Sequence, residues 1–184
     1  MDKDVFGRVQ VLDKSLCKCG VDPKLTAKIM EGGDKVLKKL KPAEKAAWLK
    51  TAMDRMDALL PDEVKFKVRE DCACCTGGKR LKIIKQLAKE NPDLDDFFKA
   101  LSKSHVFGKE VVKDGDVVNV NFGGDKCVCS PGSLSETTSI TYCHCCKGHV
   151  LKLLEAGLGK KLRADVVGSA CSGTPPCRFK VYLS

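Results

Sequence analysis

Long hydrophobic runs are absent from this 184-residue sequence, because none approaches the roughly 20 apolar residues that a membrane-spanning helix needs. A secretory signal is absent as well. Asp2 and Asp4 stand where such a signal carries basic residues, and no apolar stretch follows them. We therefore expect a cytoplasmic protein without a membrane span.

Arginine and aromatic residues are scarce. Of the 33 basic residues 6 are Arg, aromatics make up 5% of the chain, and the lysines are interspersed with acidic residues in both halves. Proteins that read bases and phosphates rely on Arg side chains and on basic stripes with interleaved aromatics. We therefore assign the formal net charge of +9 to a solvated surface, and we do not expect nucleic acid as a partner.

Several common catalytic motifs are also missing. The segment Thr76–Lys79 reads TGGK, which lacks the first glycine and the spacing of a phosphate-binding P-loop. The sequence contains neither the glycine pattern of dinucleotide-binding domains nor a Ser-centred nucleophile elbow. These absences argue against the common P-loop NTPases and α/β hydrolases.

Cysteine, in contrast, is abundant, with 12 residues in 184. The cytosol is reducing, so clustered thiols there favour metal binding or redox chemistry over structural disulfides. Buried structural thiols are the simpler alternative. Four groups hold ten of the cysteines: Cys17 and Cys19; Cys72, Cys74 and Cys75; Cys127 and Cys129; Cys143, Cys145 and Cys146. Cys171 and Cys177 stand singly.

Each group contains a Cys-X-Cys pair, which directs both thiols to the same side of an extended segment. Two such pairs from different segments could converge on one ion. A thiolate-rich set suits tetrahedral zinc, which we expect, and also an iron–sulfur cluster or Cu(I). The candidate ligands are Cys72, Cys74, Cys75, Cys143, Cys145 and Cys146, with Cys127, Cys129 and His144 as secondary candidates.

The two richest groups each lie at the start of a predicted helix, one beginning near Lys79 and the other near Gly148. A helix N-terminus lowers the pKa of a thiol and favours the thiolate. Lys79, Arg80 and Lys147 add positive charge nearby. This placement suits thiolate ligands and reactive thiols alike.

Cys145 or Cys146 is the candidate nucleophile of a thiol enzyme, with His144 or His149 as its base. Both histidines could instead ligate a metal, and His149 could simply be half-buried on the helix surface. His105 stands alone before a loop, and we expect a structural role for it.

Hydrophobic periodicity predicts a helical half over residues 1–104 and a mixed half over residues 105–184, which together form one compact α+β domain. The predicted helices of the first half span residues 5–16, 23–30, 34–40, 42–60, 79–90 and 94–104. Residues 62–71 are predicted to be either helical or a short extended segment. The second half is predicted to contain a β-hairpin around Asp114-Gly115, a strand over 135–143, a helix over 146–159, and strands over 161–171 and 177–183. We therefore expect helices packed on an antiparallel sheet.

The last 45 residues or so resemble the C-terminal part of the 4-vinyl reductase domain and its cysteine-rich bacterial relatives. The positions that carry this resemblance are Cys143, Cys145, Leu158-Gly159, Gly173 and Cys177-Arg178-Phe179. The resemblance implies a fold similar to the ligand-binding domain of haem-based nitric-oxide sensors and trafficking-complex subunits. It also implies a small, often hydrophobic ligand and a metal held by cysteines, and some relatives are hydrolases of small sulfur-containing compounds.

Three functions follow as hypotheses. The first is a cytosolic module that binds a metal, a small molecule or both. The second is a thiol-dependent hydrolase or reductase with Cys145 or Cys146 as its nucleophile. The third is a redox sensor that forms reversible disulfides, for example between Cys127 and Cys129 or within the Cys72 group. The oligomeric state stays open, with a homodimer as one option.

Overall fold

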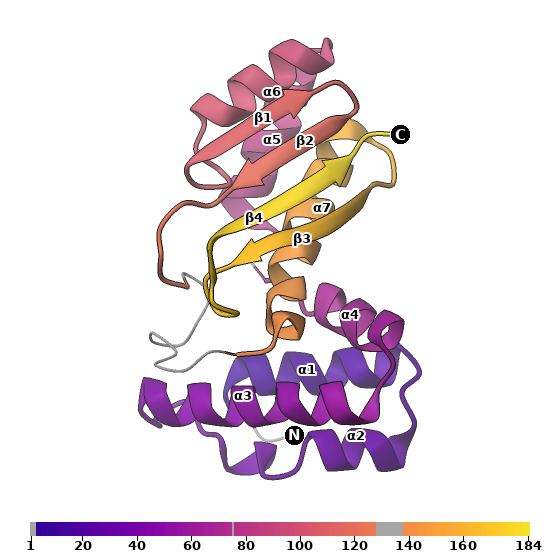
Figure 1. The fold of residues 1–184 in the computed structure, drawn as a ribbon, viewed down its shortest axis with the longest axis vertical. Coiled ribbons are helices and arrows are strands. Elements are labelled where there is room, and N and C mark those ends of the chain that lie inside the picture. The colour runs from indigo at the N-terminus through magenta and orange to yellow at the C-terminus, as the bar shows by residue number, and fades with distance from the viewer. Residues whose placement is uncertain (1–2, 75, 128–137) are drawn as a thin grey trace.

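The computed structural model describes residues 3–74, 76–127 and 138–184, and within them the protein is α+β, as expected. A four-stranded antiparallel sheet accompanies the helices (Figure 1). The helices are α1 (Gly7–Lys18), α2 (Pro23–Ile29), α3 (Pro42–Leu59), α4 (Asp62–Asp71), α5 (Gly78–Glu90), α6 (Leu94–Lys103) and α7 (His144–Leu158). The strands are β1 (Glu110–Asp114), β2 (Val117–Asn121), β3 (Arg163–Ser169) and β4 (Thr174–Tyr182).

Helices α1, α2 and α3 form a layer at the N-terminal end of the molecule, and α4 connects this layer to the sheet-containing part (Figure 1). Proline begins α2 and α3, and the Asp22 side chain accepts hydrogen bonds from the first backbone amides of α2. The faces of α1 and α3 that point inward contribute Leu16, Met53 and Met56, which are fully buried. Their burial stabilises the layer.

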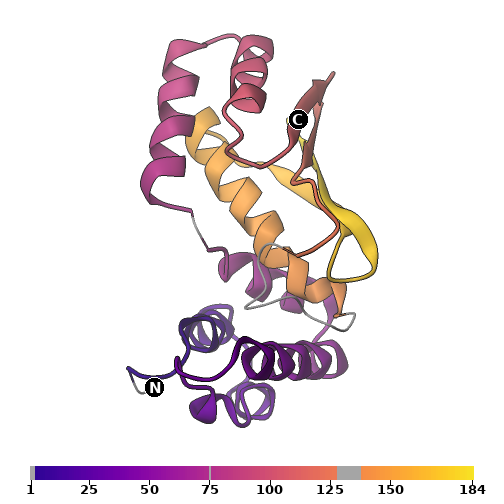
Figure 2. The ribbon, with the colours of Figure 1, turned by 90° about the vertical axis from the view of Figure 1, so that its left-hand side faces the viewer.

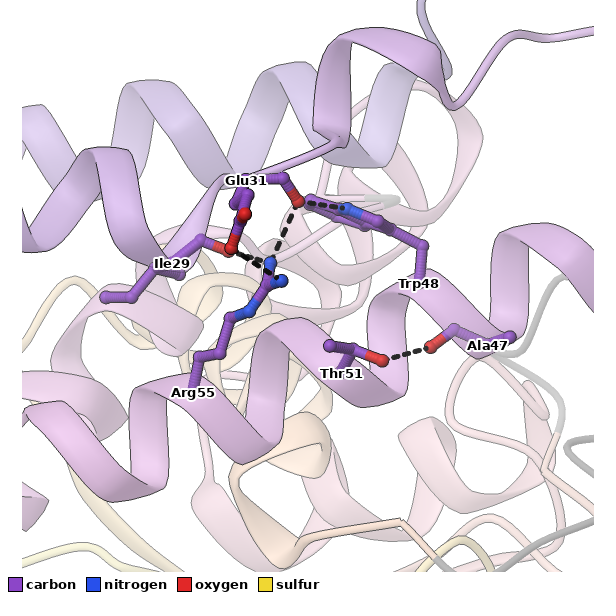
Figure 3. A network of polar contacts seen from close by, with 6 residues as sticks. All are labelled: Ile29, Glu31, Ala47, Trp48, Thr51 and Arg55. Carbon is purple, nitrogen blue, oxygen red and sulfur yellow. Dashed lines mark hydrogen bonds and ion pairs between the residues drawn. The ribbon is translucent and has the colours of Figure 1, made fainter.

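A polar network joins the end of α2 to α3 (Figure 3). Arg55 donates to the carbonyl oxygens of Ile29 and Glu31 and pairs with the Glu31 carboxylate at 3.1 Å. The Trp48 indole donates to the same Glu31 carbonyl at 3.0 Å. These bonds satisfy carbonyls that the end of α2 leaves without helical partners.

The strands follow the order β1-β2-β4-β3, with every neighbour antiparallel. Asp114 pairs with Val117, so the β1–β2 hairpin has a two-residue turn beginning at Gly115, whose φ of 55° favours glycine. Buried residues alternate along the strands, as at Val118 and Val120. Helices α5, α6 and α7 lie on one side of the sheet (Figure 2), and α6 and α7 contact β1 and β3.

Helix α4 crosses α7 at very close range. A Cβ atom at Gly148 of α7 would collide with the backbone of Glu70 near the end of α4. Only glycine therefore allows this approach. The crossing brings Cys72, which directly follows α4, beside the first turns of α7.

Two predicted elements are wrong. The described part of the predicted strand 135–143 is instead a 3-10 helix, η2 (Ile140–Cys143), because the Ser139 side chain accepts from the Thr141 amide and starts a turn. Residues 135–137 lie outside the described part. The predicted helix 34–40 is a short 3-10 turn followed by an isolated bridge between Leu37 and Val5, since pairing with the N-terminal segment takes the backbone groups that a helix would use.

Among the described residues, no helix combines the length and the apolar character needed to cross a membrane. The single-domain organisation stays a prediction.

Candidate functional site

Cys74, which precedes α5, and Cys145 and Cys146 at the start of α7 meet at a cavity of about 320 Å³, which we call the thiol cavity. It opens where α1, α7, the segment after α4 and the loops flanking β1 and β2 come together. Its lining comprises Arg8, Cys74, Arg80, Val106, Phe107, Gly108, Phe122, Cys145, Cys146 and His149. Its volume lies in the range of sites for small molecules.

A second, smaller space of about 80 Å³ shares Arg8, Cys74 and Cys145 with the thiol cavity. Cys72 and Arg69 also line it. We call this space the inner cavity. The sequence does not show whether the Cys72 group and the Cys143 group lie close together. In the structure, members of both groups line one site, and Cys145 lines both of its cavities.

Cys145 lies in the first turn of α7, and 6% of its surface is exposed. Its Sγ atom is 4.0 Å from that of Cys146. The Cys146 thiol, which donates toward it, and the guanidinium groups of Arg69 and Arg8 lower the pKa of Cys145 to about 6, although burial opposes the charge. Cys145 is thus a thiolate at neutral pH.

Arg69 is the main fixed charge beside this thiolate, with 5% of its surface exposed. It donates to the Tyr142 carbonyl oxygen at 3.0 Å and lies 5.1 Å from the centre of the Tyr142 ring. Within the described part of the chain, Arg69 forms no ion pair with a carboxylate, and its Nε atom has no hydrogen-bond partner. A buried cation needs a nearby negative charge, and the Cys145 thiolate supplies it.

Arg8 approaches the same site from α1. Its guanidinium donates to the Tyr142 hydroxyl at 2.6 Å. Burial raises the pKa of Tyr142, so the phenol is neutral at physiological pH. Arg8 lines both cavities, and its guanidinium contributes to the lowered pKa of Cys145.

His149 lies one turn further along α7. Its Nδ1 atom is 2.9 Å from the Cys74 carbonyl oxygen, and its ring meets Phe107 and Phe122 edge-on. A carbonyl oxygen only accepts, so Nδ1 carries the proton and Nε2 of the neutral ring is a hydrogen-bond acceptor. Burial, with a contribution from Arg80, lowers the pKa of His149 against the opposing effect of this hydrogen bond. The ring is therefore neutral at pH 7.

A second group of thiols lies between η2 and the strands. Cys143 Sγ is 2.7 Å from the Ser169 hydroxyl. A hydrogen bond from Cys171, followed by that of Ser169, lowers the pKa of Cys143, whereas contacts with Cys127 and Cys143 raise that of Cys171. The Cys177 sulfur accepts from the Ala170 amide at 3.4 Å. This group forms a buried thiol network that lines neither of the two cavities.

The predicted site residues thus separate into distinct sets. The structure brings together Cys72, Cys74, Cys145, Cys146 and His149. It places Cys143 and Cys127 in the second group. Cys75 and Cys129 lie outside the described residues.

His144 is not among the described residues that line either cavity. Its ring stacks on Phe66 at 3.8 Å, and its Nδ1 atom lies 3.5 Å from a carboxylate oxygen of Glu70, which also pairs with Lys147. It is therefore not placed to act as a base toward Cys145 or Cys146.

In the residues that the structure describes, no group of three or more His, Cys, Asp or Glu side chains is arranged to hold a metal ion.

The sequence reasoning missed Arg8, Arg69 and Tyr142, which come from distant parts of the chain. One available signal was the scarcity of arginine. Three of the 6 Arg residues, Arg8, Arg69 and Arg80, line these two cavities, whereas the more numerous lysines line neither.

The fold and the site define an α+β protein with a thiolate in a partly apolar cavity. The chain belongs to the family of unknown function DUF6144, whose sequence model matches residues 8–184. No curated protein and no solved structure matches it. The family match adds nothing to the resemblance to the 4-vinyl reductase domain, which stays a prediction.

Proposed function

We propose that the protein binds a small molecule in the thiol cavity and acts on it through the thiolate of Cys145. The observation that carries this proposal is the position of Cys145. It lines both cavities, beside Arg8 and Arg69, and its pKa is lowered to about 6. The thiolate is the nucleophilic form of cysteine, so Cys145 is ready to react at neutral pH.

The neighbours of Cys145 suit a thiol-dependent hydrolase. The thiolate attacks the carbonyl carbon of an ester or thioester, the alkoxide or thiolate of the ligand leaves and takes a proton from solvent, and an acyl thioester remains on Cys145. The neutral His149 can then accept a proton at Nε2 from the water that attacks this thioester, so that the S–C bond breaks, the carboxylate product leaves, the Cys145 thiolate is restored and His149 returns the proton to solvent. Phe107 and Phe122 line the thiol cavity beside His149 and give this part of it an apolar surface.

Alkylation kinetics test this proposal. The protein is treated with iodoacetamide from about pH 5 to about pH 9, and the rate at each cysteine is measured by peptide mapping. We expect Cys145 to react with an apparent pKa of about 6, whereas a free cysteine peptide titrates near its usual pKa of about 8.5. A rate at Cys145 that follows the free peptide would overturn the proposal.

Two variants serve as controls. Cys145→Ser removes the fast-reacting site. Cys146→Ala removes the thiol that donates toward Cys145 and raises the apparent pKa of Cys145, because the thiolate loses that hydrogen bond. If Cys146 rather than Cys145 carries the fast reaction, the assignment of the nucleophile is wrong.

The second candidate function is the binding of a thiolate-ligated metal, which we expect to be zinc or an iron–sulfur cluster. Cys72, Cys74 and Cys145 all line the inner cavity, and thiolates are the ligands that soft metals prefer. No three such side chains in the described part of the chain are arranged around one ion, so binding would require these side chains to move together. Metal analysis after anaerobic purification tests it. About one equivalent of zinc or iron, with Cys72 and Cys74 protected from alkylation until a chelator is added, would support it. Less than about half an equivalent after reconstitution would contradict it.

A further inference from the structure

Apart from the Cys145 thiolate, the charged groups in the described lining of the thiol cavity are positive. Arg8 and Arg80 contribute two guanidinium groups, and no Asp or Glu is among the described residues that line it. Arg69 adds a third positive charge at the adjoining inner cavity. Arg69 and Arg8 act on the Cys145 thiolate, whereas Arg80 has no ion-pair partner among the described residues, so its positive charge remains open to a ligand of the thiol cavity.

Arg80 differs from the other two arginines because it is exposed at the mouth of the site. It lies in the first turn of α5, and it forms no hydrogen bond or ion pair with any residue that the structure describes. Its charge nevertheless acts on His149 across the cavity. A planar guanidinium in this position matches the two oxygen atoms of a carboxylate.

The rest of the lining is mostly apolar. Val106, Phe107 and Phe122 form one wall, and the ring of His149 stands edge-on to both phenylalanines. A wall of this kind favours a flat or branched apolar group through burial and ring–ring contacts. The volume of about 320 Å³ restricts the ligand to a small molecule.

We infer that the thiol cavity takes a small carboxylate with an apolar, preferably aromatic, body, and that Arg80 binds its carboxylate group. The apolar body then lies against Phe107 and Phe122. This inference rests on the proposed function, since the same cavity holds the reactive thiolate. It names the class of ligand that the thiolate meets there.

A pair of alkylating reagents isolates the effect of charge. Iodoacetate and iodoacetamide carry the same reactive carbon, and in both cases the thiolate forms an S–C bond while iodide leaves with the electrons of the C–I bond. They differ in one negative charge. We expect the ratio of the iodoacetate rate to the iodoacetamide rate to be higher at Cys145 than for a free cysteine peptide.

The variant Arg80→Gln lowers this ratio about threefold, the size expected for one partly exposed charge contact. Lys79→Gln is the matched control, because it removes one positive charge at the neighbouring position of α5, and Lys79 does not line the cavity. We expect the control to keep the wild-type ratio. Equal ratios in wild type and Arg80→Gln, or equal losses in both variants, would overturn the inference.

Protection experiments test the apolar part. Benzoate should slow alkylation of Cys145 by iodoacetamide, while benzamide, which has the same ring without the charge, and acetate, which has the charge without the ring, should protect less. Equal protection by benzoate and benzamide would contradict a role for the carboxylate, and equal protection by benzoate and acetate would contradict the apolar wall. If Cys145 reacts with iodoacetamide at a low pKa but shows no preference for anions, the proposed function stands and this inference fails. If Cys145 shows no low-pKa reaction, the proposed function itself fails.

Discussion

The Nδ1 atom of His149 lies 2.9 Å from the backbone carbonyl oxygen of Cys74, although 75 positions separate the two residues in the sequence. This hydrogen bond joins the segment that follows α4 to the middle of α7. It also sets the tautomer of the imidazole, because the carbonyl requires a proton on Nδ1. His149 is the only histidine among the described residues that line the thiol cavity. The orientation of its ring thus depends on the backbone of Cys74, a residue that the sequence predicts as a metal ligand.

The first prediction concerns the protonation of His149. We expect the neutral form with its proton on Nδ1 at pH 7, and a pKa below the usual value of about 6.5, mainly because the ring is buried. Nitrogen-15 NMR of the histidine rings measures both, and His149→Asn identifies the signal. A signal with the proton on Nε2 would show that the bond to Cys74 does not set the tautomer, and titration above pH 6.5 would contradict the dominant effect of burial on the pKa.

The second prediction concerns the charge of Arg69. Arg69→Gln should raise the pKa of Cys145 by about one unit or more, because it removes the closest buried cation from the thiolate. The matched variant Arg69→Lys keeps the charge and should give a smaller change. The pH dependence of alkylation measures both effects.

Arg8→Gln provides a second route to the same question if Arg69→Gln does not fold. It should also raise the pKa of Cys145, though less than the loss of Arg69 does, because Arg69 makes the larger contribution. If Cys145 keeps a pKa of about 6 without either guanidinium, the electrostatic explanation fails.

The third prediction links Cys145 to stability. Its pKa is about 6 in the folded state and about 8.5 in an unfolded chain, so the unfolded state binds more protons between these values. The stabilisation that the thiolate provides is therefore complete above about pH 8.5 and is lost as the pH falls through about 6. We expect the free energy of unfolding of the wild type, relative to Cys145→Ser, to rise from about pH 6 to about pH 8.5. Urea titrations measure it, and a pH-independent difference would refute the linkage.

The fourth prediction concerns the crossing of α4 and α7. Gly148→Ala should lower the free energy of unfolding by about 1–3 kcal/mol, since the new Cβ atom collides with the backbone of Glu70. Gly7→Ala is the control, because a Cβ atom at Gly7 meets open space and alanine favours the helix. Urea denaturation compares the two. Equal stabilities of both variants would mean that the crossing relaxes without loss.

Local sequence patterns predicted much of the fold. Pro23 and Pro42 marked helix starts, and Asp114-Gly115 marked the hairpin. The sequence offered Gly157 or Gly159 as the end of α7, and the structure places the left-handed cap at Gly159. The segment around Tyr142 was predicted as a strand because its residues are β-branched and aromatic. There the Ser139 cap and the burial of Tyr142 against Arg69 and Arg8 outweigh that propensity.

The site was only partly predictable. The placement of Cys145 and Cys146 at a helix start follows from sequence, as does His149 one turn later. The convergence of Cys72 and Cys74 with them depends on the α4–α7 crossing. Long-range packing of this kind leaves no local sequence signal, and the same holds for the arrival of Arg8 from α1.

The most direct test of the account is an ultraviolet titration of thiolate absorbance in the wild type and in Cys145→Ser, from about pH 5 to about pH 9. The difference between the two curves reports Cys145 alone if the other thiols titrate alike in both proteins. The account predicts a midpoint of about 6 for this difference. A midpoint at or above about 8.5, the value of an ordinary cysteine, would contradict it.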